Sequence, residues 1–126
     1  MNGKTIISNR GKHYEVADTH FNSEGVRVKV ITLCGSLKFQ KEMMMVAEVM
    51  ALEGNCILTP VYPIIENCER TEEQLEKLKK AHFKRIELSD AILVIDIDGY
   101  IGYSTNLEIE YARKLEKEII YYTDLR

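Results

Sequence analysis

The sequence feature that most constrains the fold is the run Ala91–Ile95, which is apolar at every position and ends abruptly at Asp96. A short run of this kind is typical of a parallel strand that is covered on both faces. Two glycines follow it, and Ser104 or Thr105 is then suited to begin and cap a helix. Because ligands bind beyond the carboxyl ends of the strands in open parallel sheets, this turn is the expected position of a functional site.

The remaining elements repeat the alternation of strand and helix. The sequence predicts strands over 28–33, 55–58, 91–95 and 118–122, and helices that begin after Ser36, at Thr71 and near Ser104. With right-handed crossovers, this order predicts a single-domain α/β fold. The expected architecture is an open, four-stranded parallel sheet of the Rossmann or flavodoxin-like kind, with helices on both faces.

The first 25 residues are expected to be an extension that precedes the domain at 26–126. Residues 5–7 and 13–16 are predicted to pair as a β-hairpin, because a few residues that include a glycine separate them. An oligomer contact and a lid are both open roles for this extension.

The composition excludes several classes of function. A formal net charge of -3, with 17 dispersed basic residues, gives no electrostatic footprint for a nucleic acid polymer or an anionic membrane. The chain has neither an apolar run of membrane-spanning length nor a signal-peptide core, so we expect a cytoplasmic protein. Cys34, Cys56 and Cys68 are odd in number and lack Cys-x-x-Cys spacing. We therefore expect no disulfide framework, no metal site and no cofactor.

Two junctions between a strand and a helix carry candidate binding groups. The first predicted strand runs into Cys34-Gly35-Ser36, where the glycine permits close backbone approach at a helix N-terminus that favours an anionic or hydroxyl-rich ligand. The last helix carries Glu108 on its buried side. The helix dipole would favour the ionised form that a nucleophile needs, although a simple helix-capping acid fits the local sequence equally well.

The middle helix contributes an unexpected histidine. His82 falls on the apolar stripe formed with Leu75, Leu78 and Ile86, where a leucine would be expected. A buried neutral histidine that is satisfied by a backbone carbonyl fits this position.

Three segments together resemble the nucleoside 2-deoxyribosyltransferase superfamily. They are Cys34-Gly35-Ser36, the strand entry Ser89–Val94, and the segment Gly102–Ala112 that contains Glu108. The similarity covers about residues 28 to 122, and it is closer to the small branch that includes the 2′-deoxynucleoside 5′-phosphate N-hydrolases. It implies the cleavage or transfer of an N-glycosidic bond in a nucleoside or its 5′-monophosphate.

The resemblance implies roles at the matched positions. Glu108 matches the nucleophilic glutamate that attacks C1′ of the deoxyribose and displaces the base. The turn that contains Gly35 and Ser36 would lie against the sugar and phosphate. The turn that contains Gly102, Ser104 and Thr105 matches the place where phosphate-preferring members carry small hydroxyl residues. Family members complete their pockets with a neighbouring subunit, so a homodimer or a higher homo-oligomer is expected.

One position departs from the family pattern. His82 stands eight residues before Asp90, where the hydrolases carry an aspartate that helps to protonate the leaving base. A histidine can donate such a proton, so His82 is a candidate acid, while Asp96 and Asp98 are the alternative acids at the end of the strand.

Two hypotheses of function remain open at this point. The first is an N-glycosidase or deoxyribosyltransferase, and the second is a nucleotide-binding or nucleotide-sensing module that keeps the pocket without turnover. Glu108 favours the first hypothesis and the departure at His82 favours the second. A flavin or dinucleotide binder is disfavoured because the chain lacks Gly-x-Gly-x-x-Gly.

Overall fold

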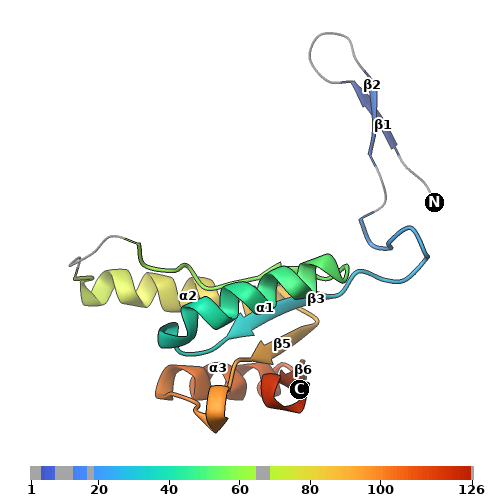
Figure 1. The fold of residues 1–126 in the computed structure, drawn as a ribbon. Helices are drawn as coiled ribbons and strands as arrows, with labels where there is room; N and C mark the ends of the chain where they lie inside the picture. The colour runs from blue at the N-terminus through green and yellow to red at the C-terminus, as the bar shows by residue number, and fades with distance from the viewer. Residues whose placement is uncertain (1–3, 8–12, 17–18, 65–68, 126) are drawn as a thin grey trace.

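The computed structural model describes residues 4–7, 13–16, 19–64 and 69–125. Its elements, in chain order, are β1 (Lys4–Ile7), β2 (His13–Val16), β3 (Val30–Cys34), η2 (Leu37–Phe39), α1 (Gln40–Leu52), β4 (Cys56–Leu58), α2 (Glu72–Leu88), β5 (Ala91–Val94), η3 (Ile97–Gly99), α3 (Tyr103–Lys114), β6 (Glu118–Tyr121) and η4 (Tyr122–Asp124). The η elements are single 3-10 turns. Figure 1 shows this arrangement.

Four strands form one parallel sheet in the order β4-β3-β5-β6. The register pairs Cys34 of β3 with Val94 of β5, and Val94 with Tyr121 of β6, so the carboxyl ends of these three strands lie together. This topology confirms the open parallel sheet predicted from the sequence.

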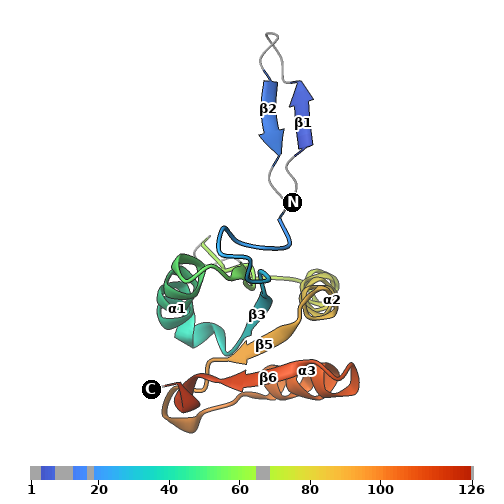
Figure 2. The ribbon, with the colours of Figure 1, turned by 90° about the vertical axis from the view of Figure 1, so that its right-hand side faces the viewer.

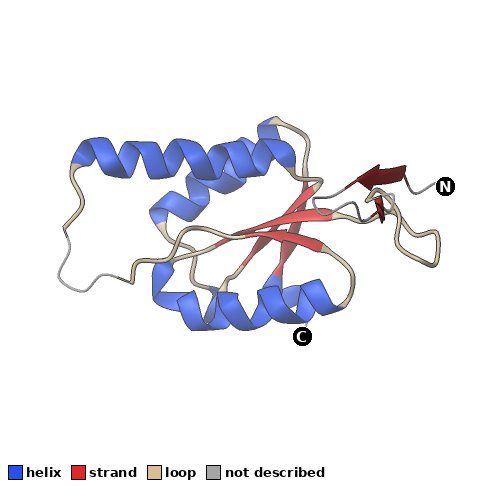
Figure 3. Cartoon of the chain, turned by 90° about the horizontal axis from the view of Figure 1, so that it is seen from above, coloured by secondary structure: helices blue, strands red, loops and turns tan. Residues whose placement is uncertain are grey.

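The two faces of the sheet are covered by different helices. Ile31, Leu33, Leu93 and Ile95 pack on one side with residues of α1, whereas Cys34, Ile92 and Val94 pack on the other side with residues of α2 and α3. Figure 3 shows the sheet between these two helical layers. Because side chains alternate along a strand, Cys34 faces the same layer as α2 and α3.

Helix α2 begins as the sequence predicts. The Thr71 side chain accepts a hydrogen bond from the N–H of Gln74, and the Gln74 side chain accepts one from the N–H of Thr71. The other end of α2 is tied to β3, because the Thr32 hydroxyl lies within hydrogen-bond distance of both the carbonyl of Arg85 and the hydroxyl of Ser89, the C-cap of α2. This double contact fixes the position of the C-terminal half of α2 over the sheet.

Helix α3 begins earlier than predicted. Gly102 is its N-cap and Tyr103 its first residue, so Ser104 and Thr105 lie inside the first turn rather than at the cap. The buried stripe of α3 consists of Thr105, Ile109 and Ala112, and Glu108 lies beside it.

The N-terminal strands β1 and β2 pair antiparallel, which confirms the predicted hairpin, although the residues that connect the two strands, 8–12, lie outside the described residues. Figure 2 shows the hairpin beyond the end of the parallel sheet. A boundary between an extension and a domain near residue 25 stays a prediction. None of the helices in the described parts of the chain is both long and apolar enough to cross a membrane.

Candidate active site

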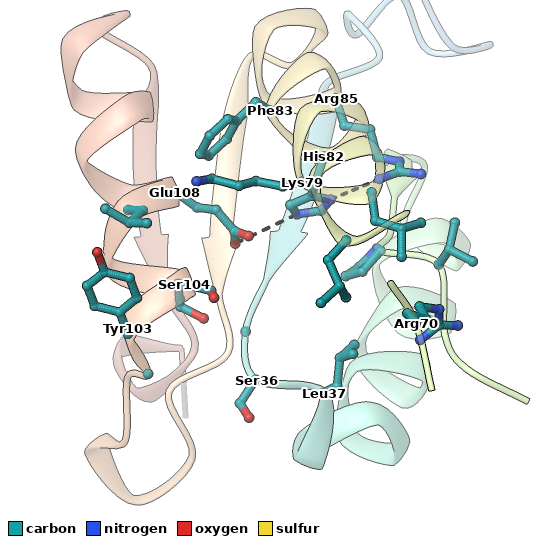
Figure 4. Close-up of a pocket in the computed structure, with 18 of the residues that line it drawn as sticks. Ser36, Leu37, Arg70, Lys79, His82, Phe83, Arg85, Tyr103, Ser104 and Glu108 are labelled. Atoms are coloured by element: carbon teal, nitrogen blue, oxygen red, sulfur yellow. Dashed lines mark hydrogen bonds and ion pairs between the residues drawn. The ribbon is translucent and has the colours of Figure 1, made fainter. Parts of the chain in front are cut away.

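A pocket of about 610 Å³ opens beside the carboxyl ends of β3 and β5, between α2 and the N-terminal half of α3. Its walls come from the turn after β3, the loop after β4, α2 and the start of α3. Figure 4 shows most of the residues that line it. The full set of lining residues is Gly35, Ser36, Leu37, Pro60, Val61, Arg70, Leu75, Leu78, Lys79, His82, Phe83, Arg85, Tyr100, Gly102, Tyr103, Ser104, Thr105, Leu107 and Glu108.

At the bottom of this pocket, three polar side chains from three elements converge. His82 Nε2 lies 3.8 Å from Glu108 Oε1 and 3.7 Å from Cys34 Sγ. Only 8% of the His82 side chain and 18% of the Glu108 side chain are exposed, and Cys34 is fully buried. The cluster is therefore largely shielded from water, and it meets the pocket through Glu108 and His82.

The local sequence explains why the side chains of Cys34, His82 and Glu108 point towards one another. Cys34 is the last residue of β3 and faces α2 because it alternates with Leu33, which faces α1. His82 lies one helical turn before the fully buried Ile86, so both side chains point to the sheet. Glu108 adjoins Ile109 of the buried stripe, and this position turns its carboxylate towards α2.

Burial controls the protonation of the cluster. It raises the pKa of Glu108 from the usual 4.5 to about 7, although a hydrogen bond with Cys34 partly opposes the rise. Glu108 is the sixth residue of α3, whereas the favourable effect of a helix dipole is confined to the first turn. The expectation that the dipole holds Glu108 in its ionised form is therefore wrong, because desolvation outweighs it.

His82 is shifted in the opposite direction. Burial, together with the neighbouring charge of Arg85, lowers the pKa of His82 from 6.5 to about 4. Arg85 Nη1 lies 3.1 Å from His82 Nδ1, and a guanidinium can only donate, so Nδ1 accepts this hydrogen bond. The proton of the neutral ring is consequently on Nε2, which faces Cys34 and Glu108.

No protein-family model matches the sequence, and no curated protein matches it. Among solved structures, a 2-desoxiribosyltransferase from Leishmania mexicana matches over 75% of this chain with a TM-score of 0.56 and 19% sequence identity. The chain shares its fold with a deoxyribosyltransferase. It spans 63% of the length of that neighbour.

Within this deoxyribosyltransferase-like fold, most of the residues singled out from the sequence lie at one place. Gly35 and Ser36 form one side of the pocket, opposite Gly102, Ser104 and Thr105. Glu108 and His82 line the same pocket with their side chains directed towards each other (Figure 4), and Cys34 Sγ lies 3.7 Å from His82 Nε2. The glycine at 35 is favoured by packing, because a Cβ there would lie 3.1 Å from the Cβ of Ile95 and the neighbouring strand end would have to shift.

The two alternative acids are placed elsewhere. Asp96 is buried and does not line the pocket; its carboxylate accepts hydrogen bonds from the N–H and the hydroxyl of Thr123. Asp98 is exposed in η3 at a φ of 53° and is likewise outside the pocket lining. Asp96 therefore anchors the segment after β6, and neither side chain is positioned to protonate a base in this pocket.

Several pocket residues were not anticipated from the sequence. Arg70, Lys79 and Arg85 bring positive charge to the walls, whereas Lys38, the cation nearest to the turn after β3 in the sequence, does not line the pocket. Lys38 instead lies with its Nζ 3.4 Å from the centroid of the Tyr100 ring. Helical spacing could have indicated Lys79, since it lies one turn before His82 on the same helix.

Proposed function

We propose that the protein cleaves or transfers the N-glycosidic bond of a deoxynucleoside or nucleoside, or of its 5′-monophosphate, with Glu108 as the nucleophile. The observation that carries the proposal is a mostly buried carboxylate at the bottom of a 610 Å³ pocket, beside a neutral imidazole that faces it with a donor. The fold shared with a deoxyribosyltransferase supports the same reaction class.

In the first step, an oxygen of the Glu108 carboxylate forms a bond to C1′ while the bond from C1′ to the base nitrogen breaks. The electron pair leaves with the base, which then takes up a proton from solvent. In the second step, water or another base attacks C1′ and releases the carboxylate. Water gives hydrolysis and a second base gives transfer.

His82 has a different role here from the acid that the family pattern suggested. With a pKa of about 4, the ring is neutral at pH 7 and is a poor proton donor for the leaving base. Its Nε2–H lies 3.8 Å from Glu108 Oε1, and a small rotation brings it into hydrogen-bond distance. We assign to His82 the task of orienting the ionised carboxylate and stabilising its charge.

The rim of the pocket suits a sugar that carries a phosphate. The first N–H groups of α3, from Tyr103 onward, have no carbonyl partner within the helix and favour an anion. The hydroxyl of Ser104 and the cationic side chains of Arg70 and Lys79 also line the pocket. These groups support a nucleoside 5′-monophosphate and the small branch of 2′-deoxynucleoside 5′-phosphate N-hydrolases as the nearer functional counterpart.

A homodimer or a higher homo-oligomer belongs to the same proposal. Helix α1 presents Met44, Met45, Val49 and Leu52 to solvent, with exposed fractions from 53% to 81%. An apolar row of this kind on one helix favours contact with another protein surface. Sedimentation of the full chain over a range of concentrations tests this part, and a monomer throughout would refute it.

The test of the reaction class is base release from a panel of nucleosides and nucleoside 5′-monophosphates, in both ribo and deoxy forms. We expect Glu108→Gln to reduce release by at least about a hundredfold, because the nucleophile is lost. Glu110→Gln is a matched control, since Glu110 lies on the same helix with 71% of its side chain exposed and pairs with Arg113. Equal losses in both variants would contradict the proposal.

A non-catalytic nucleotide-binding or nucleotide-sensing module is the second candidate. The neutral state of His82 favours it, because a ring with a pKa of about 4 has no proton to give to a leaving base at pH 7. Nucleotide binding by both wild type and Glu108→Gln, without base release by either, would establish the module and rule out the enzyme.

A further inference from the structure

The cluster at the bottom of the pocket has a second chemical capacity, which depends on the histidine. Cys34 Sγ, His82 Nε2 and a carboxylate oxygen of Glu108 all lie within 4.8 Å of one another. The two distances from Nε2 are 3.7 Å to Cys34 Sγ and 3.8 Å to Glu108 Oε1. The three atoms are therefore the corners of a compact triangle with one donor of each kind.

These separations are close to those of a tetrahedral zinc site. With bond lengths of about 2.0 to 2.3 Å, donor atoms around Zn²⁺ lie roughly 3.3 to 3.6 Å apart. The observed distances from Nε2 exceed this range by only a few tenths of an ångström. Side-chain rotations that also shorten the separation between Cys34 Sγ and the Glu108 carboxylate, which is within 4.8 Å, would bring all three donors to a common ion.

We propose that Cys34, His82 and Glu108 bind one thiophilic divalent cation, with Zn²⁺ as the preferred ion, and that occupancy blocks the nucleophile. A thiolate, an imidazole and a carboxylate are the donor set that Zn²⁺ takes in proteins, whereas Mg²⁺ and Ca²⁺ prefer oxygen donors alone. Three protein donors leave a fourth position, and it points into the pocket because Glu108 and His82 line it.

Charge balance supports the ion in this environment. The Cys34 thiol gives its proton to solvent when the sulfur binds the metal, and Glu108 binds as the carboxylate. Two negative donors and one dication then form a neutral unit. Such a unit suits a location where Cys34 is fully buried and the other two side chains are 8% and 18% exposed.

Arg85 opposes metal binding and makes the proposal testable. In the free protein, Arg85 donates to His82 Nδ1, so the ring proton is on Nε2. When a metal binds Nε2, the ring proton moves to Nδ1. The Nδ1–H group then needs a hydrogen-bond acceptor, which the Arg85 guanidinium cannot provide. A glutamine at position 85 offers that acceptor, and Arg85→Gln is therefore expected to bind Zn²⁺ about 10- to 100-fold more tightly.

Binding is measured on the untagged full chain with Co²⁺ and Zn²⁺ as probes. We expect one Co²⁺ per chain, with a thiolate-to-metal charge-transfer band in the near ultraviolet, and displacement of Co²⁺ by Zn²⁺. Cys34→Ser should abolish the charge-transfer band and weaken the affinity for Zn²⁺ by at least about a hundredfold. A double variant, Cys56→Ser with Cys68→Ser, is the matched control. It should keep the charge-transfer band and the affinity for Zn²⁺, since Cys56 is exposed on β4 and outside the cluster.

Two results would overturn the site. One is a band that survives Cys34→Ser but is lost in the double control variant. The other is weaker Zn²⁺ binding by Arg85→Gln than by wild type, because this variant keeps all three metal donors and offers the Nδ1–H of His82 an acceptor.

The inhibitory part rests on the proposed function and is tested separately. Base release should fall in parallel with Zn²⁺ occupancy and return when a chelator removes the ion. Zinc binding without any base release in the metal-free protein would remove the enzyme proposal and leave the metal site standing. Full base release at saturating Zn²⁺ would instead refute the inhibition alone.

Discussion

The pH dependence of base release distinguishes two roles that His82 can have beside Glu108. If neutral His82 orients the carboxylate, the reaction requires only that Glu108 is ionised. The value of kcat/KM then rises about tenfold per pH unit up to about pH 7, where Glu108 titrates, and remains level above it. If His82 is instead the acid for the leaving base, the active form needs an ionised Glu108 and a protonated His82 together.

The two pKa values make the second case quantitatively different. Since His82 titrates at about 4 and Glu108 at about 7, only about one molecule in a thousand has this combination of charges between those values. Above pH 7 that fraction falls about tenfold per pH unit, because His82 continues to lose its proton while Glu108 is already ionised. The two roles therefore predict different trends above pH 7: kcat/KM stays level if His82 orients the carboxylate and declines if His82 is the acid.

The assay measures kcat/KM for base release from about pH 5 to about pH 9, with a substrate that has no titration of its own in this range. His82→Gln, which keeps a neutral donor, should retain the level alkaline limb with a reduced maximum. A decline of wild-type activity above pH 7 that disappears in His82→Gln would refute the orienting role.

Three further predictions concern stability. Glu108→Gln should stabilise the fold by about 3 kcal/mol at pH 8 and by almost nothing at pH 4, because the folded pKa of about 7 exceeds the usual 4.5, and wild type loses stability as pH rises between these values. Urea unfolding at both pH values measures this difference, and an equal effect at the two would contradict it. Gly35→Ala should lower stability by about 1 to 3 kcal/mol, since its Cβ would lie 3.1 Å from the Cβ and 3.3 Å from the carbonyl oxygen of Ile95; an unchanged unfolding midpoint would show that the strand end yields freely. Asp96→Asn should cost about 1 to 3 kcal/mol, because one of the two hydrogen bonds from Thr123 loses its acceptor, while KM for the nucleoside stays unchanged. A raised KM would instead place Asp96 in the site.

The sequence was sufficient to predict the sheet and its helical layers because hydrophobic periodicity determines both. The stripe that includes Met43, Val46 and Met50 packs on one face, as its helical spacing requires. The all-apolar strand at 91–94 is fully buried between the layers. Boundaries were less predictable: the start of α3 at Tyr103 depends on the backbone at Gly102, and hydroxyl residues close by gave a competing signal.

Three members of the candidate site could be singled out from the sequence, but their arrangement and the cationic residues of the pocket walls could not. Cys34, His82 and Glu108 were each singled out for a separate reason, yet their proximity depends on how two crossovers bring α2 and α3 over β3. Local sequence also could not weigh burial against the helix dipole at Glu108. For Asp96, the deciding partner is Thr123, which follows a different strand and gives no local signal.

The open mouth of the pocket has a consequence for the products. Leu75 and Val61 line the pocket and are 51% and 55% exposed, so solvent reaches the space above Glu108. If Glu108 is the nucleophile, as proposed, a sugar held on its carboxylate meets water more often than a second base, and we expect free sugar as the main product. Any surface that closed the mouth while admitting a base would change the balance towards exchange of one base for another. The ratio of hydrolysis to transfer would then depend on the residues at the rim of the pocket, while the residues that break the N-glycosidic bond stay the same.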